Sequence, residues 1–472
     1  MFGSVSEALE YIRENDISLI DLKIGSLAGE WLHISIPSRE FGENYFQQGV
    51  GFDGSSVRGF GRLESGDLAA VPDPATGFLD PFYEKPTLSF ICDTVTADTK
   101  EPYGRSPRAV ARRAERYLAD SDTADAALFA PEFEFNIFDR VKVINKPFHT
   151  CVRIAAGETR EQGGSYGIPA KGGYLRTPPL EQLHILRSEI VAVLENVGVP
   201  VHYHHHEVGA AGQCEIEVSL DTLTRAADKT MLIKYVVKNV ARRRGKLATF
   251  MPKPIHGEPG NGMHVHQMLG KAGRNLFYDP SPRRYANLSE VAFSYIGGLL
   301  RHGPALTGLT NPSTNSFKRL VEGFEAPVSL FFSLANRSAA VRVPKYAVGP
   351  EEKRIEYRPP DFTGNVYLTL AGMLMAGIDG VTKKIDPTAA GFGPFDVDIS
   401  QAQPELRGRI TPLPLSVEEA LRALSSDRQF LLAGGVFGDD LIDAWMDLRL
   451  SQEVREVRHR PHPYEYYLYL DA

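Results

Sequence analysis

Cysteine is scarce in this chain of 472 residues, which contains three. Cys92, Cys151 and Cys214 lie far apart and form no CxxC pair. Neither a disulfide framework nor a zinc ribbon is expected, because both need cysteines in pairs at short, regular spacings.

Long apolar runs are also missing. The longest, Val366–Ile378, is followed directly by Asp379 and falls short of the about 20 residues that a membrane span needs. Residues 1–7 contain no basic region followed by an apolar stretch, so they do not resemble a signal peptide. We expect a cytoplasmic protein without a membrane partner.

Positive charge is in deficit, because 52 Lys and Arg oppose 59 Asp and Glu, giving a formal charge of −7. A general binder of nucleic acid or anionic membranes needs a positive field, so both partners are excluded. The sequence also lacks a Walker A motif and a Rossmann fingerprint. A small anionic ligand in a locally basic pocket stays possible.

Hydrophobic residues at 43% and charged residues at 24% are ordinary values for a globular protein. Near the start, alternating residues 19–24 and 31–36 predict a β-hairpin. Ser106-Pro107 then predicts the start of a helix that runs through Tyr117. We therefore place a small α+β domain at 1–104 and a larger domain at 105–472.

The larger domain alternates helix and strand signals. Helices are predicted over 180–197, 222–244 and 288–300, the first two followed by Gly198 and Gly245. Residues 139–171 show little periodicity and many glycines, so we interpret them as a surface loop region.

Four strand-like segments place ionisable residues at every second position: 130–135, 213–218, 262–266 and 354–358. One such segment alone is typical of a solvated strand face. Four together indicate a shared polar cavity, because buried carboxylates need partners or a metal. The oxygen-rich donor set suits Mg²⁺ or Mn²⁺: Glu132, Glu134, Glu207, Glu215, Glu356 and His264.

A set of arginines follows in the later half of the sequence: Arg319, Arg337, Arg342, Arg354 and Arg358. The planar guanidinium fork suits carboxylate and phosphate oxygens. Acids and arginines in one cavity favour metal-assisted phosphoryl transfer. The alternative is that these arginines pair with surface acids.

Ordered motifs along nearly the whole chain resemble glutamine synthetase of the bacterial type I form. The matching stretches are 51–56 (GFDGSS), 130–134 (APEFE), 171–174 (KGGY), 204–208 (HHHEV), 253–254 (KP), 262–264 (GMH), 311–316 (NPSTNS), 323–327 (GFEAP), 336–338 (NRS) and 354–358 (RIEYR).

This resemblance implies an α+β fold: a small N-terminal β-grasp domain and a catalytic domain whose curved antiparallel sheet forms a half-barrel surrounded by helices. It implies ATP-dependent ligation of ammonia to the γ-carboxylate of L-glutamate through γ-glutamyl phosphate. The partners would be L-glutamate, ammonium and ATP. The family's oligomer is a dodecamer of two hexameric rings with active sites between subunits.

The resemblance also implies roles for individual residues, and it assigns two Mg²⁺ or Mn²⁺ ions per site. One ion would be held by Glu134, Glu207 and Glu215, the other by Glu132, His264 and Glu356. Glutamate would be bound by Gly260, Asn261, Arg319 and Arg358. ATP would be bound by His266, Arg337, Arg342 and Arg354. The ammonium site would comprise Asp53, Ser56, Tyr174 and Glu207. The catalytic residues would be Asp53 from a neighbouring subunit, Glu325 on a loop that closes the site, and Arg337.

Some residues depart from the family's pattern. Pro259-Gly260-Asn261 stands where Asn-Gly-Ser or Asn-Gly-Ala is common, which keeps a γ-glutamyl-amine ligase acting on another amine as an alternative. A non-catalytic structural or regulatory homologue is a second alternative, although all six metal ligands are present. Phe395 lies where adenylylated members carry a tyrosine, so we expect no adenylylation there.

Overall fold

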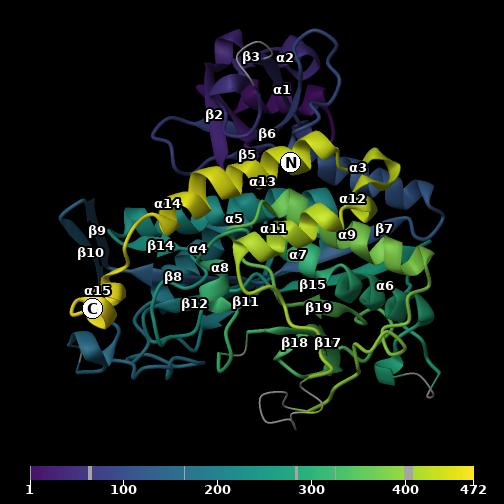
Figure 1. Cartoon of the computed structure of the whole chain (residues 1–472). Coiled ribbons are helices and arrows are strands. Elements are labelled where there is room, and N and C mark those ends of the chain that lie inside the picture. Colours follow the sequence, from purple (N-terminus) through teal and green to yellow (C-terminus); the bar gives the residue numbers. More distant parts are fainter. Residues whose placement is uncertain are drawn as a thin grey trace.

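The computed structural model describes residues 2–61, 66–163, 165–281, 285–324, 326–397, 405 and 408–472. An N-terminal sheet, drawn at the top of Figure 1, has the strand order β2-β1-β6-β4-β3, with β5 paired to β6. Its strands are β1 (Leu19–Gly25), β2 (Trp31–Pro37), β3 (Val50–Asp53), β4 (Asp67–Pro72), β5 (Phe78–Leu79) and β6 (Thr87–Thr96). The antiparallel β1–β2 pair confirms the predicted hairpin.

Two helices accompany this sheet, α1 (Val5–Glu14) and α2 (Glu43–Gln48). Ser4 caps α1 by accepting a hydrogen bond from the Glu7 amide, which satisfies one of the free N–H groups at a helix start. Alternate apolar residues of β1 pack with those of β6 in a core separate from that of the remaining chain.

Two further sheets form the body of the molecule. One has the order β11-β12-β8-β14, and the other the order β13-β7-β15-β19-β18-β17, with β16 paired to β15. The strands are β7 (Ala126–Pro131), β8 (Phe133–Phe138), β11 (Val201–His206), β12 (Gln213–Val218), β13 (Asp221–Thr222), β14 (Leu247–Thr249), β15 (Val265–Lys271), β16 (Arg274–Asn275), β17 (Ser329–Leu334), β18 (Ala339–Val343) and β19 (Ile355–Tyr357). Their pairings are antiparallel except β17–β18, which is parallel.

A single residue, Glu132, separates β7 from β8, so the chain passes there from one sheet to the other. The sequence pattern treats residues 130–135 as one strand. The structure instead places Glu132 at the junction between two strands, because β7 and β8 pair with different neighbours.

Helices lie between the N-terminal sheet and the strands of the body (Figure 1). The longer ones are α3 (Pro107–Asp120), α4 (His184–Asn196), α5 (Leu223–Arg243), α6 (Glu290–Arg301), α7 (Gly303–Thr310), α9 (Val366–Thr382), α11 (Val417–Ser426) and α13 (Asp439–Arg449). The short ones are α8 (Ser316–Arg319), α12 (Gln429–Leu432), α14 (Arg455–Arg458) and α15 (Pro463–Tyr469).

The central helix is α9, which contains the longest apolar run and is buried along nearly its whole length. It packs against α3, α5, α6 and α7. A Cβ atom on Gly298 of α6 would lie 2.0 Å from the Ala376 carbonyl oxygen of α9, so only glycine permits this close approach. None of the helices in the described ranges has both the length and the apolar character needed to cross a bilayer.

The predicted helices are confirmed, with one shifted start. The helix predicted from residue 180 begins at His184, because residues 180–183 form turns and irregular backbone. The loop prediction for 139–171 is wrong in part. β9 (Arg140–Lys146) and β10 (His149–Ala155) form an antiparallel hairpin there, which is largely exposed except where Val141 and Ile154 pack against a small apolar cluster.

Candidate active site

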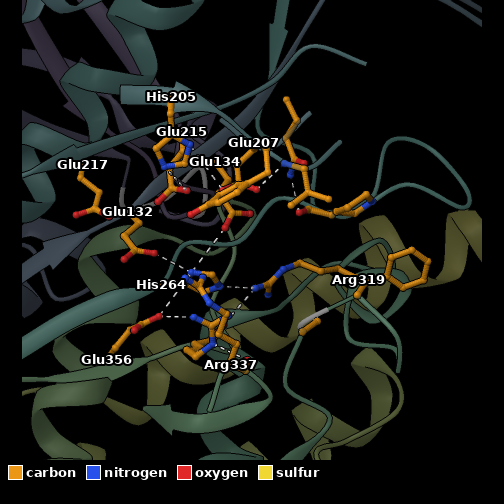
Figure 2. A pocket seen from close by; sticks show the side chains of 18 of the residues that line it. Glu132, Glu134, His205, Glu207, Glu215, Glu217, His264, Arg319, Arg337 and Glu356 are labelled. Carbon is orange, nitrogen blue, oxygen red and sulfur yellow. Dashed lines mark hydrogen bonds and ion pairs between the residues drawn. The ribbon is translucent and has the colours of Figure 1, made fainter. Parts of the chain in front are cut away.

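A cavity of about 430 Å³ lies where the two sheets of the body meet (Figure 2). All six residues predicted as metal ligands line it: Glu132, Glu134, Glu207, Glu215, His264 and Glu356. In Figure 2 they form two groups facing each other. We call Glu134, Glu207 and Glu215 the acid-rich half, and Glu132, His264 and Glu356 the arginine-flanked half.

Strand register brings these side chains together. On the four-stranded sheet, Glu215 of β12 lies opposite Glu134 of β8 and opposite His205 of β11. On the larger sheet, Glu356 of β19 lies opposite His266 of β15 and opposite Arg342 of β18. Directly opposed residues have Cβ atoms about 5 Å apart, so each sheet delivers a compact set of donors to the cavity.

The acid-rich half concentrates negative charge. Burial and the charge of Glu207 raise the pKa of Glu134 to about 7. Burial and the neighbouring Glu132, Glu134 and Glu207 charges also raise the pKa of Glu215. The Gly262 amide donates to the Glu134 carboxylate at 2.6 Å, but no lysine or arginine forms an ion pair with these three carboxylates among the described residues. A bound cation would relieve this repulsion.

Fixed positive charge borders the arginine-flanked half. Arg342 and Arg358 each form an ion pair with Glu356. Burial alone would raise the pKa of Glu356, but the charge of Arg358 and that of Arg342 help lower it to about 2. Burial and the charge of Arg358 lower the pKa of His264 to about 4, so its imidazole is neutral near pH 7, the form that binds metals.

Glu132 links the two imidazoles of this half. One carboxylate oxygen lies 2.8 Å from His264 Nδ1, and the other lies 2.9 Å from His266 Nε2. The Glu132 amide also donates to the His264 carbonyl oxygen at 2.8 Å. Side chain and backbone therefore hold the junction between β7 and β8 against the segment that leads into β15.

Three groups of ligand atoms lie close enough to hold a metal ion: Glu132 with His266 and Glu356; His205 with Glu207 and Glu215; and Glu132 with Glu215 and Glu217. Each predicted ligand set shares two members with one of these groups. The remaining two, Glu134 and His264, connect the halves, because His264 Nδ1 lies 3.6 Å from a Glu134 oxygen. This donor set, rich in carboxylate oxygen and free of thiolate, fits a hard divalent cation.

Sequence patterns alone do not identify His205 or Glu217 as site residues, nor His266 as a neighbour of the metal ligands. Glu217 continues the period-two pattern of β12, and its carboxylate accepts a hydrogen bond from Tyr203. His205 belongs to a run of three histidines in which alternation alone does not identify the inward residue. Cross-strand register is the information that selects it.

Four of the predicted substrate arginines line the cavity: Arg319, Arg337, Arg342 and Arg358. Arg319 lies with Nη2 at 3.3 Å from His264 Nε2. Arg354 lies outside the lining. Its guanidinium carbon is 5.4 Å from the centre of the Tyr346 ring, and Tyr346 does line the cavity.

Gly260 and Asn261, which are predicted to bind glutamate, lie at different distances from the cavity surface. Gly260 lines the cavity, whereas Asn261 is completely buried behind it. Asn261 donates to Asn136 Oδ1 at 2.7 Å and accepts from Gln213 Nε2 at 3.1 Å. Gln213, which the sequence analysis did not select, also donates to the Gly260 carbonyl oxygen at 2.9 Å.

The residues predicted to bind the ammonium substrate lie in two different regions of the chain. Tyr174 and Glu207 line the cavity, and the Tyr174 ring packs edge-on against His205. Asp53 and Ser56 lie in the N-terminal unit, away from this cavity, where Asp53 accepts hydrogen bonds from both Ser55 and Ser56. Glu325 lies outside the described residues.

Two sheets that meet at a buried carboxylate–imidazole cavity bordered by arginines define the class: a metal-using enzyme for anionic substrates. Comparison with known proteins gives the family. The family model "Glutamine synthetase, catalytic domain" matches residues 104–469, and "Glutamine synthetase, beta-Grasp domain" matches residues 16–97. The chain belongs to the glutamine synthetase family, and the predicted fold class is confirmed.

Curated relatives agree over the full length. The glutamine synthetase of Frankia alni is 46% identical, covering 100% of both chains, and that of Aquifex aeolicus is 45% identical, covering 98% of both. Among solved structures, the Plasmodium falciparum glutamine synthetase has a TM-score of 0.90 at 26% identity, covering 99% of both chains. A GmaS/ADP complex has a TM-score of 0.82 at 27% identity, covering 100% of both.

Proposed function

We propose that this chain uses ATP to join ammonia to the γ-carboxylate of L-glutamate, giving L-glutamine, ADP and phosphate through γ-glutamyl phosphate. The observation that carries the proposal is the pairing, in one cavity, of buried carboxylates and imidazoles with four arginines. Full-length identity of about 45% to curated glutamine synthetases supports the same reaction.

Two Mg²⁺ or Mn²⁺ ions are proposed for each site. Glu134, Glu207 and Glu215 would hold one, and Glu132, His264 and Glu356 the other, with His205, His266 and Glu217 as neighbouring donors. When bound, divalent cations neutralise phosphate charge and polarise the phosphoryl group.

The first half-reaction brings two anions together, because the glutamate γ-carboxylate attacks the terminal phosphorus of ATP and ADP departs. Arg319 and Arg358 are proposed to hold glutamate, and Arg337 and Arg342 the phosphates. Positive charge held in place before reaction lowers such a barrier electrostatically. The buried Nε–H of Arg342 lacks a hydrogen-bond partner within the described residues, which supports its use as a donor to an anion.

The second half-reaction needs a neutral amine. Ammonia attacks the acyl carbon of γ-glutamyl phosphate, the bond from that carbon to the phosphate oxygen breaks, and the ammonium proton goes to a carboxylate. Glu207, with Tyr174 beside it, is proposed to attract ammonium. Hydrogen bonds from Ser55 and Ser56 lower the pKa of Asp53, which keeps this carboxylate negatively charged; we assign it the attraction of ammonium and the acceptance of its proton on the basis of the family resemblance.

A homo-oligomer is proposed, with a dodecamer of two hexameric rings as its form. Asp53 and Ser56 do not line the cavity of their own chain, so we assign their proposed roles to the cavity of a neighbouring subunit. The C-terminal helix α15 supports association, because it exposes apolar side chains that a second copy could cover. We also propose the domain division at 1–104 and 105–472, and a cytoplasmic location.

An amine panel tests the reaction. The full-length chain is incubated with Mg²⁺ or Mn²⁺, ATP and L-glutamate, and phosphate and product are measured for ammonium, methylamine and putrescine in turn. We expect ammonium to give the highest rate and glutamine as product. A strong preference for another amine would contradict glutamine formation, and no phosphate release with any amine would contradict an enzyme.

A further inference from the structure

The ring of Phe324 lies close to two ammonium groups. Lys253 Nζ is 3.6 Å from the ring centre, and Lys171 Nζ is 4.8 Å from it. These three residues come from segments far apart in the sequence. Phe324 and Lys171 both line the cavity, so the cluster forms part of its wall.

The two lysines are held by contacts that do not involve Phe324. The Glu258 carboxylate accepts from the backbone amide of Lys171 at 3.3 Å and from that of Ala210 at 3.0 Å. Lys253 Nζ donates to the Glu258 carbonyl oxygen. The backbone of Lys253 exchanges two hydrogen bonds with the Asn315 side chain, at 2.7 and 3.0 Å. The Lys253 ammonium group and the backbones of both lysines are therefore held by contacts other than those with Phe324.

Within the described part of the segment that follows Gly323, Phe324 is the residue that contacts the two lysines. Gly323 and Ala326 line the cavity beside it, and Gly323 has φ +88°, a conformation that favours glycine. The face of an aromatic ring is electronegative and attracts cations within about 6 Å. Both ammonium groups lie within that range of the Phe324 ring.

We propose that Phe324 is a positioning residue: its ring, seated on Lys171 and Lys253, holds the Gly323–Phe324 wall segment over the cavity and keeps water from the acyl phosphate. The inference rests on the proposed function. Water that reached γ-glutamyl phosphate would attack the acyl carbon and break the bond to the phosphate oxygen. Glutamate and phosphate would form, so ATP would be consumed without glutamine.

The ratio of ADP released to glutamine formed tests this role. Phe324→Leu keeps an apolar side chain but removes the ring face, Phe324→Tyr keeps the face, and Lys253→Met removes one cation. With ATP, glutamate, Mg²⁺ and ammonium, we expect a ratio near one for the wild type and Phe324→Tyr. Phe324→Leu and Lys253→Met should raise the excess of this ratio over one, which compares hydrolysis with glutamine formation, by about threefold, as expected for a lost cation–π contact.

Tyr83→Leu is the matched control, because it removes a ring near Lys23, 5.3 Å away in the N-terminal unit. Its ratio should stay near one. The proposal is overturned if Phe324→Leu or Lys253→Met forms glutamine at the wild-type ratio, or if Phe324→Tyr rises equally. If Phe324→Leu fails to fold, Lys253→Met alone decides. A wild-type chain that makes no glutamine contradicts the proposed function, which is a different result.

Discussion

The two halves of the cavity use similar ligands under opposite electrostatic conditions. In the acid-rich half, Glu134, Glu207 and Glu215 lie together, and repulsion and burial raise the pKa of Glu134 and that of Glu215. In the arginine-flanked half, Arg342 and Arg358 compensate Glu356. The first half needs a cation to become neutral, whereas the second is largely neutral before any ion arrives. Substitutions in the arginine-flanked half should therefore mainly lower stability, whereas substitutions in the acid-rich half should mainly weaken metal binding.

The largest expected effect on folding lies in the arginine-flanked half. Glu356→Gln would leave Arg342 and Arg358 buried without their shared carboxylate, and breaking a buried pair costs about 3–5 kcal/mol. Denaturant unfolding in the presence of a chelator measures the loss. Glu40→Gln, which removes the acid of an exposed pair with Arg39, should leave the unfolding midpoint unchanged. A Glu356→Gln protein as stable as the wild type would contradict the view that the arginine-flanked half stabilises the fold.

The next effect concerns activity. Glu134→Gln should lower the rate of glutamine formation by at least about 100-fold, because losing this proposed metal ligand should cost no less than losing an outer-shell partner of a metal site, which costs about 10–100-fold. Without metal the same variant should unfold at no lower denaturant concentration than the wild type, because a repulsive charge is gone. Rates and unfolding curves are measured on the same preparation. A Glu134→Gln chain that is active but destabilised would contradict the view that Glu134 serves metal binding and destabilises the metal-free fold.

The smallest effect is a difference in pH dependence in metal-free protein. The pKa of Glu134 is raised from 4.5 to about 7, so its stabilising contribution is complete below pH 4.5 and is lost as the pH rises through 7. The pKa of Glu356 is lowered to about 2, so its contribution is present above pH 4.5 and lost as the pH falls towards 2.

Chemical unfolding between pH 3 and pH 8 measures both slopes. Glu134→Gln should remove the loss between about pH 4.5 and 7, which is on the order of 1–3 kcal/mol. Glu356→Gln should remove the loss on the acid side. Saturating Mg²⁺ should flatten the slope between about pH 4.5 and 7, because a bound cation favours the ionised form of Glu134. Identical profiles for the two variants would show that the halves do not differ.

Much of the fold could be predicted from local patterns. The hairpin of β1 and β2, the start of α3 at Pro107 and the long α5 all follow from alternation, capping and glycine signals. The β9–β10 hairpin was missed because the surrounding residues are rich in glycine. The alternation of Arg140, Val141, Lys142 and Val143 was the available signal.

Most residues of the candidate site could be predicted from the sequence, but their positions relative to one another could not. Period-two spacing selects Glu132 and Glu134, but spacing does not reveal that a sheet boundary lies at residue 132. His205 needs the register of β11 against β12 before it can be assigned. The depth of Asn261 depends on Asn136 and Gln213, which lie far from it in the sequence.

The single residue between β7 and β8 has a consequence for the length of the chain. Side chains alternate along a strand, so deleting or adding one residue there would exchange the two faces of β8. Phe133 and Phe135 would then face the cavity, and Glu134 would face the apolar core. The single residue between the two strands therefore determines which side chains of β8 face the cavity.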